Sequence, residues 1–199
     1  MAPFITNTQT HQRIMSELEM IEQHLEAERR YRDVLDLLGN DTKREGLINT
    51  PMRHVKFLVE FLTHEPYEFT TFESDTDEMV VVRNIPFYSL CEHHVLPFFG
   101  TANIGYIPTK KMVGLSKIPR CLDEYARGLQ NQERITTQVA NRLMKELEPK
   151  GVMVTLTAQH LCMAMRGVKK SNVPTTTSKT LGVFRTDQMA RAEFLNLAK

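Results

Sequence analysis

The stretch "EMVVVRNIPFYSLCEHHVLPFFGTANIGYIP", residues 78–108, decides the fold predicted for this chain of 199 residues. Its two ends, residues 78–89 and 100–108, are rich in β-branched and aromatic residues, which favour strands. The residues between them include Pro97 and Gly100, which favour a turn. The pattern therefore predicts a hairpin that carries one cysteine, one glutamate and two histidines at its connection.

Helical periodicity dominates the residues before this hairpin and those that follow it. Residues 10–38 place apolar side chains, from Ile14 to Leu38, at three- and four-residue steps, and Gly39 supplies a stop. A second helix is expected to begin at Thr50 with Pro51 in its first turn. Residues 116–147 predict two helices, broken near Gly128. The apolar stripe of residues 10–38 needs a surface to lie against, either the chain's own core or a partner subunit.

The last third of the chain returns to strands. Residues 151–167 predict a strand, and residues 180–197 predict a short strand that leads into a final helix. Strand alternation would place these residues on one face: Val152, Val154, Leu156, Ala158, His160 and Cys162. Together the segments predict an α+β fold, an antiparallel sheet with helices on one face. A helical region over residues 1–70 is expected to precede a domain over residues 71–199.

Composition excludes several classes of function. Lysine and arginine total 25 and aspartate and glutamate 24, so no overall field attracts nucleic acid or an anionic membrane. Three cysteines, an odd number, favour a reducing compartment over a secreted disulfide framework. The first residues do not resemble a signal peptide, and no apolar run approaches the roughly 18 residues of a spanning helix. We expect a cytoplasmic protein.

Cys91, His94 and Cys162 are candidate metal ligands. A C-x-x-H pair that turns toward Cys162 would give two thiolates and one imidazole, a set suited to Zn²⁺ with one position left for water. His93 and His160 would then stand beside that water, where an imidazole can transfer protons near neutral pH. The competing interpretation is that these residues merely end a strand, because cysteine is often buried as a small apolar residue. Cys121 lies in a helical stretch without polar neighbours, and we expect it to be structural.

Basic residues and one carboxylate form a second group of candidates. Ser116 begins a predicted helix whose N–H groups favour anions, and Lys117 and Arg120 share one of its faces. With these, a polyphosphate could be held by a further set: Arg53, Lys56, Arg166, Lys169 and Lys170. Glu133 could accept hydrogen bonds from an N–H/NH₂ edge such as guanine presents. The alternative is that each is an ordinary solvated side chain.

These residues together resemble the GTP cyclohydrolase I family. The resemblance runs from about Arg44 to Leu197. It rests on C-E-H-H followed by P-F-F-G, then G-L-S-K, Q-E-R and H-L-C-M-A-M-R-G in that order. The resemblance implies that Cys91, His94 and Cys162 are zinc ligands and that His93 and His160 are catalytic.

The same resemblance implies roles in binding GTP. Glu133 matches the residue that recognises guanine, with Gln132 beside it. The ribose and triphosphate are expected on Ser116, Lys117, Arg120 and Arg166, and on Arg53 and Lys56 from a neighbouring subunit. Thr157 departs from the family pattern, in which many relatives have an acidic residue three positions before the H-x-C histidine.

The resemblance also implies a fold, a reaction and an assembly. The fold is a T-fold unit behind an N-terminal helical region. The reaction is hydrolysis of GTP at C8 to formate and 7,8-dihydroneopterin triphosphate, the first step toward pterins and tetrahydrofolate. The assembly is a homodecamer with active sites at subunit interfaces. Two alternatives stay open: a T-fold nitrile reductase that uses NADPH, and a nucleotide-binding paralogue without catalysis.

Overall fold

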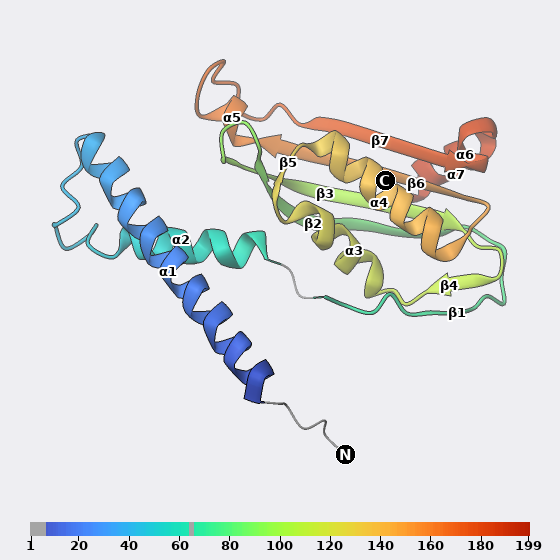
Figure 1. Ribbon diagram of the computed structural model, residues 1–199. Coiled ribbons are helices and arrows are strands. Elements are labelled where there is room, and N and C mark those ends of the chain that lie inside the picture. The colour runs from blue at the N-terminus through green and yellow to red at the C-terminus, as the bar shows by residue number, and fades with distance from the viewer. Residues whose placement is uncertain (1–6, 64–65) are drawn as a thin grey trace. The chain divides into compact units, whose positions relative to one another are not determined.

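Figure 1 shows the computed structural model, which describes residues 7–63 and 66–199. The chain divides into two compact units, Met1–Phe61 and Leu62–Lys199. This boundary lies at the end of the second helix, whereas the sequence predicted it at residue 70. The division into a helical region over residues 1–70 and a domain over residues 71–199 stays a prediction. Among the described residues, no helix is both long enough and apolar enough to cross a membrane.

The first unit contains the two predicted helices, α1 (Asn7–Leu37) and α2 (Thr50–Leu62). α1 ends at Leu37, two residues before the predicted stop at Gly39. The φ of Gly39 is 83°, which glycine adopts without strain. The N–H of Asn40 closes this end by donating to the carbonyl of Leu35 over 3.0 Å. Of the predicted apolar stripe, Ile14 lies outside the residues whose side chains are described, while Leu18 and Leu25 are about half exposed.

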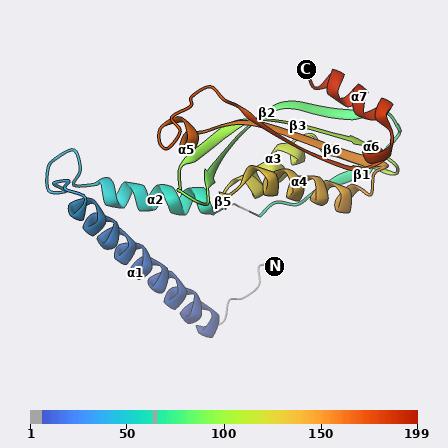
Figure 2. The same ribbon diagram turned by 90° about the horizontal axis from the view of Figure 1, so that it is seen from above.

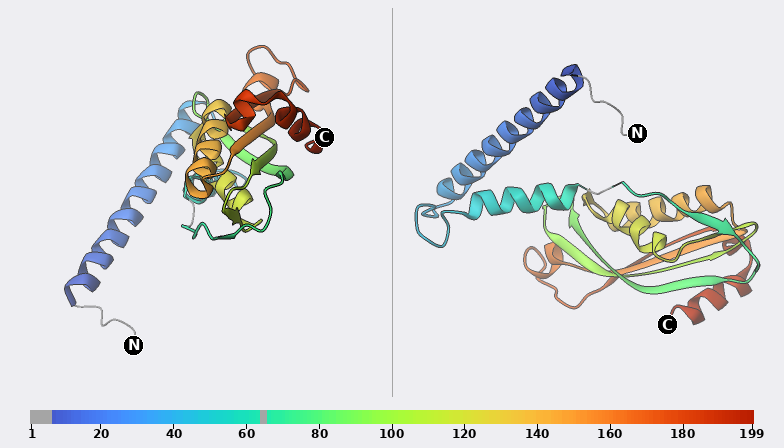
Figure 3. Two further views of the ribbon diagram at one scale, coloured as in Figure 1. Left: turned by 90° about the vertical axis from the view of Figure 1, so that its right-hand side faces the viewer. Right: turned by 90° about the horizontal axis from the view of Figure 1, so that it is seen from below.

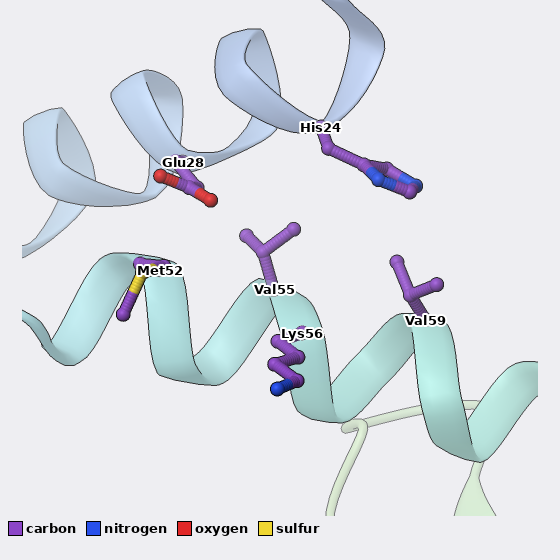
Figure 4. A pocket seen from close by; sticks show the side chains of 6 residues that line it. All are labelled: His24, Glu28, Met52, Val55, Lys56 and Val59. Carbon is purple, nitrogen blue, oxygen red and sulfur yellow. The ribbon is translucent and has the colours of Figure 1, made fainter. Parts of the chain in front are cut away.

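α1 and α2 pack through a small set of side chains. The ring of Tyr31 stacks on His54 with centroids 4.3 Å apart, and Val55 is buried. Beside them lies a hollow of about 230 Å³, which Figure 4 shows with Val55 pointing toward α1. Its lining consists of His24, Glu28, Met52, Val55, Lys56 and Val59.

The second unit is built on a five-stranded sheet in the order β5-β2-β3-β6-β7. These strands are β2 (Val80–Cys91), β3 (Pro97–Ile107), β5 (Leu129–Gln130), β6 (Gly151–His160) and β7 (Thr175–Gly182). All pairs are antiparallel except β2 with the two-residue β5. A separate small ladder joins β1 (Thr71–Glu73) to β4 (Lys111–Val113). The predicted hairpin is thus β2 and β3.

Two helices cover one face of this sheet, α3 (Lys117–Ala126) and α4 (Gln132–Leu147), as Figure 2 shows. Apolar residues of these helices, among them Ile118 and Leu143, join Val154 and Leu156 of β6 in one buried core. Gly128, with φ of 150°, separates the two helices, as the sequence predicts. The predicted α+β layout, a mainly antiparallel sheet covered by helices, is confirmed.

The final helix that the sequence predicts lies on the opposite face of the sheet from α3 and α4. After the short α6 (Val183–Thr186), α7 (Gln188–Leu197) packs across the sheet from α4 (Figure 3). Phe194 of α7 and Phe184 of α6 bury Met153 of β6. The face that α7 covers is therefore the one to which the odd-numbered side chains of β6 point.

The predicted strand over residues 151–167 is wrong beyond His160. β6 ends there, and a short helix, α5 (Leu161–Ala164), follows. The register pairs Phe98 with His160, so the next position would set Leu161 opposite Pro97, the first residue of β3. Proline has no N–H to continue the ladder. Cys162 consequently lies on α5 and does not share a strand face with His160.

Gly100 gives the first test of this packing, because β3 and β6 approach closely at that residue. A Cβ added at Gly100 would lie 1.9 Å from the carbonyl oxygen of Thr157 and 2.7 Å from the Cα of Ala158. Gly100→Ala should therefore lower the free energy of unfolding by about 1–3 kcal/mol or more. Chemical denaturation measures this loss.

Gly114→Ala is the matched control for Gly100→Ala. Its added Cβ would meet nothing closer than Lys117 Cγ at 3.7 Å, and its effect should stay within about 0.5 kcal/mol. Equal stability of the two variants would contradict the close approach of β3 and β6.

Candidate functional site

The polar group of the hairpin lies in a tight turn over residues 91–96, beyond the end of β2. The N–H of Cys91 donates to the carbonyl of Leu96, and the N–H of Val95 donates to the carbonyl of Cys91, each over 2.8 Å. Val95 has φ of 54°, a conformation costly for a β-branched residue and typical of turns held for function. The turn keeps Cys91 buried and leaves His93 and His94 exposed.

The pairing of β3 with β6 brings the second half of the group to this turn. Because Phe98 pairs with His160, the end of β6 lies beside the start of β3, and α5 then carries Cys162 back toward Cys91. The ligand atoms of Cys91, His94 and Cys162 all lie within 4.8 Å of one another. Residues that are far apart in the chain thus converge on one point.

The distances suit a metal ion held by sulfur and nitrogen. Cys91 Sγ lies 3.6 Å from His94 Nδ1. Tetrahedral bonds of about 2.3 Å to sulfur and about 2.0–2.1 Å to nitrogen would place the two atoms about 3.6 Å apart. The group fits a divalent ion that prefers thiolate and imidazole, and Cys162 supplies the third ligand atom.

The electrostatics of Cys91 and Cys162 also favour a bound cation. Burial raises the pKa of Cys162, and the neighbouring Cys91 raises it further. Two adjacent thiols oppose each other's ionisation, and a bound cation would remove that opposition by stabilising both thiolates. Cys121 differs, because it is fully buried in α3 and burial raises its pKa to about 12. Its environment is that of a structural thiol, as the sequence predicts.

His160 and His93 lie close in the chain to these candidate ligands, two residues before Cys162 and between Cys91 and His94. The ring of His160 stacks on Phe98 with centroids 4.6 Å apart and an interplanar angle of 5°. Its Nε2 lies 2.8 Å from Oε1 of Gln132. Burial lowers the pKa of His160, and the nearby Glu133 carboxylate acts in the opposite direction. His93 is 69% exposed, with Nδ1 3.8 Å from Cys91 Sγ.

The turn is fastened to α4 by an ion pair that the sequence analysis missed. Arg134 donates through both terminal nitrogens to the Glu92 carboxylate, over 2.7 and 3.1 Å, and Asn131 Nδ2 donates to it over 3.1 Å. Hydrogen bonds from Arg134 and then Asn131 hold the pKa of Glu92 below its ordinary value. This contact holds the start of α4, with Gln132 and Glu133, beside the turn of residues 91–96.

The candidate anion-binding residues are less closely gathered. Arg166, exposed just after α5, donates from Nη1 to His94 Nε2 over 2.6 Å. Ser116 precedes α3, but its side chain makes no capping hydrogen bond. The C-terminal end of α3 leads to β5 beside Cys91, so its first residues lie about 15 Å back along the helix. Within the described chain, no hydrogen bond or ion pair joins Ser116, Lys117 or Arg120 to the Cys-His-Cys group.

Arg53 and Lys56 belong to α2 in the first unit, where both are exposed and Lys56 lines the hollow against α1. Thr157 is also exposed, and its hydroxyl lies 2.9 Å from that of Thr176. Strand alternation sends Thr157 to the face opposite His160. The departure from the family pattern at this position therefore does not alter the surroundings of His160 directly.

The fold and the site together define a class: α+β proteins with a candidate three-ligand metal centre at one end of an antiparallel sheet. The sequence model described as GTP cyclohydrolase I matches residues 27–199. This chain belongs to the GTP cyclohydrolase I family.

Curated relatives agree over most of their length. GTP cyclohydrolase 1 of Porphyromonas gingivalis is 48% identical over 189 residues, which cover 92% of this chain and 97% of the relative. The enzyme of the same name from Leptospira biflexa is 49% identical over 174 residues, covering 84% and 94%. That of Parabacteroides distasonis is 51% identical over 177 residues, covering 85% and 89%. Among solved structures, the apo archaeosine synthase QueF-Like matches 54% of this chain and 97% of its own with a TM-score of 0.44 and 14% identity.

Exchange of single cysteines tests the metal site. If these residues bind a divalent ion, protein loaded with zinc should hold about one ion per chain, and Cys91→Ser and Cys162→Ser should each hold nearly none, because a hydroxyl is a much weaker ligand than a thiolate. Elemental analysis after dialysis against a weak chelator measures the ion. Cys121→Ala is the control, since Cys121 lies in the core, and it should retain the metal. Full retention by either serine variant would exclude that cysteine as a ligand.

Proposed function

We propose that this chain is a zinc-dependent GTP cyclohydrolase I. It would hydrolyse the guanine ring of GTP at C8, giving formate and 7,8-dihydroneopterin triphosphate, the first step toward pterins and tetrahydrofolate. The convergence of Cys91, His94 and Cys162 in a chain of this family carries the proposal. Relatives 48–51% identical to this chain bear the name GTP cyclohydrolase 1.

Cys91, His94 and Cys162 would hold the zinc. Bound there, Zn²⁺ would supply Lewis-acid chemistry that activates water near neutral pH. If His94 binds through Nδ1, the atom that faces Cys91, its remaining proton lies on Nε2. Arg166 could then no longer donate to Nε2 and would be free to face an anion such as a phosphate.

The histidines would handle the protons of the reaction. Opening the imidazole ring requires water to add at C8 and a proton to reach the adjacent nitrogen. His160 is held against Phe98 and partly buried, so it is the group we assign to that transfer. His93, which is exposed, would serve as a second acid or base. Two hydrolytic steps at C8 release formate, and closure of the new ring after rearrangement of the ribose returns one water.

The substrate would be anchored at both ends, so that remote binding energy holds C8 at the metal. Glu133, exposed in the first turn of α4, would accept hydrogen bonds from the guanine edge. Gln132 was predicted beside it. The ribose and triphosphate would be held by Ser116, Lys117, Arg120 and Arg166, together with Arg53 and Lys56.

These anchors support a site shared between subunits. The start of α3 lies about a helix length from Cys91 in the same chain, so Ser116 and Lys117 of a second copy are better candidates for one substrate. The half-exposed stripe of Leu18, Ile21 and Leu25 on α1 gives a further reason for association. We propose a homodecamer with active sites at its interfaces. Its thiolate ligands and free cysteines suit the cytoplasm, and no nucleic acid or membrane is expected as a partner.

A turnover assay tests the proposed reaction. Zinc-loaded protein incubated with GTP should release formate and yield a product that becomes a fluorescent pterin after oxidation. Cys162→Ser, expected to lose its metal, is the negative control. Neither product from wild-type protein with zinc bound would contradict the activity. GTP binding without turnover would favour a paralogue that only binds nucleotide, and NADPH-dependent turnover of a nitrile would favour a reductase.

The mass of the protein in solution tests the assembly. Ten copies of a 23.0 kDa chain give a particle of about 230 kDa by analytical ultracentrifugation. The double variant Ile21→Asp/Leu25→Asp should yield smaller species, because it buries charge in the proposed contact. Gln23→Glu, at an exposed polar position of the same helix, should not. An unchanged mass of the double variant would exclude α1 from the interface.

A further inference from the structure

Gln132 is buried, although the sequence placed it with Glu133 at the guanine edge. It is the first residue of α4 and only 1% exposed, whereas Glu133 faces solvent. Its amide nitrogen donates to the carbonyls of Leu156 and Thr175 over 2.9 and 3.0 Å, and lies 3.1 Å from the hydroxyl of Thr177. The amide is therefore enclosed by β6, β7 and its own helix.

These contacts determine which end of the amide is the nitrogen. The carbonyl oxygens of Leu156 and Thr175 can only accept, so the group that faces them must donate. Turning the amide over would set its oxygen against two carbonyl oxygens and lose both of these hydrogen bonds. The Oε1 atom of Gln132 must therefore be the end that faces His160.

Two threonine hydroxyls complete the hydrogen-bond network around Gln132. The hydroxyl of Thr136 donates to the backbone carbonyl of Gln132 over 2.7 Å, which uses its single proton. Thr177, whose hydroxyl lies 2.7 Å from that of Thr136, must then be the donor between the two. Its oxygen lies 3.1 Å from the Gln132 amide nitrogen, whose two protons are directed to the carbonyls of Leu156 and Thr175. Each hydroxyl proton thus has one acceptor, and the donor in each hydrogen bond among Gln132, Thr136 and Thr177 is determined.

The consequence falls on His160. Its Nε2 lies 2.8 Å from an oxygen that can only accept, so this nitrogen carries a proton and donates it. In a neutral imidazole the lone pair then lies on Nδ1. Among the described residues, no hydrogen bond to the protein involves Nδ1. Phe98 covers one face of the ring, so Nδ1 is the polar atom left for substrate.

We propose that Gln132 is a positioning residue: locked between β6 and β7, it holds His160 as the Nε2–H tautomer and leaves Nδ1 to accept and deliver the proton at the substrate. The catalytic part of this role rests on the proposed function, but the tautomer does not. Gln132 would act on the purine only through His160, whereas Glu133 would contact the guanine itself. The two neighbours should then affect catalysis in different ways.

Nuclear magnetic resonance of histidine labelled with ¹⁵N tests the tautomer directly. Zinc-loaded wild-type protein should show a protonated Nε2 and an unprotonated Nδ1 for neutral His160, with its signals assigned by their loss in His160→Gln. A protonated Nδ1 with a bare Nε2 would overturn the proposal. This measurement needs neither turnover nor a stable Gln132 variant, so it decides the point even if the proposed reaction fails.

Kinetics then separate positioning from direct recognition. Gln132→Met, close in size but unable to accept or donate as an amide does, should lower kcat about 10–100-fold and leave KM for GTP nearly unchanged. Its spectrum should show His160 in mixed tautomers. Glu133→Gln should chiefly raise KM. Gln138→Met is the matched control on the same helix, since Gln138 hydrogen-bonds to Gln130 and not to His160, and it should change neither constant. A raised KM with unchanged kcat in Gln132→Met would overturn the positioning role.

Discussion

The antiparallel pairing of β3 with β6 is the constraint on which the site depends. It sets Phe98 opposite His160, and it brings the strands so close that residue 100 has no room for a side chain. Pro97 ends the ladder at that point, and the chain must turn into α5. That turn returns Cys162 to Cys91. One register of hydrogen bonds thus brings together both halves of the candidate metal site and stacks His160 on Phe98.

Polar contacts from α4 then hold the turn of residues 91–96 and His160 in place. Arg134 and Asn131 hold Glu92, which fastens this turn to the start of α4. One residue further on, Gln132 reaches across to His160. The Gln132 amide is the buried part of this set, and its polar atoms are satisfied only when its nitrogen faces Leu156 and Thr175 and its oxygen faces His160. The candidate metal ligands, His160 and the start of α4 with Glu133 are consequently positioned by the same few hydrogen bonds.

The sequence predicted the elements better than their contacts. Periodicity located the two N-terminal helices, the hairpin and the break near Gly128, because each depends on a local pattern of apolar or turn residues. The strand predicted over residues 151–167 extended too far, because its end at His160 depends on Pro97 of the neighbouring strand. Cys91, His94 and Cys162 lie together, and the roles that the resemblance implies for the other motif residues stay predictions. The partner of His160 was missed, because a buried glutamine and two threonines leave no pattern in the chain until the sheet brings them together.

The proposed function requires that two sulfurs and one imidazole of this chain bind one zinc ion and leave a position open. X-ray absorption at the zinc edge of the purified, zinc-loaded protein measures this coordination. Two sulfur neighbours at about 2.3 Å and one imidazole nitrogen at about 2.0–2.1 Å are expected, with the fourth neighbour a light atom that changes when substrate binds. A shell of oxygen and nitrogen alone, or four protein ligands that substrate leaves unaltered, would contradict it.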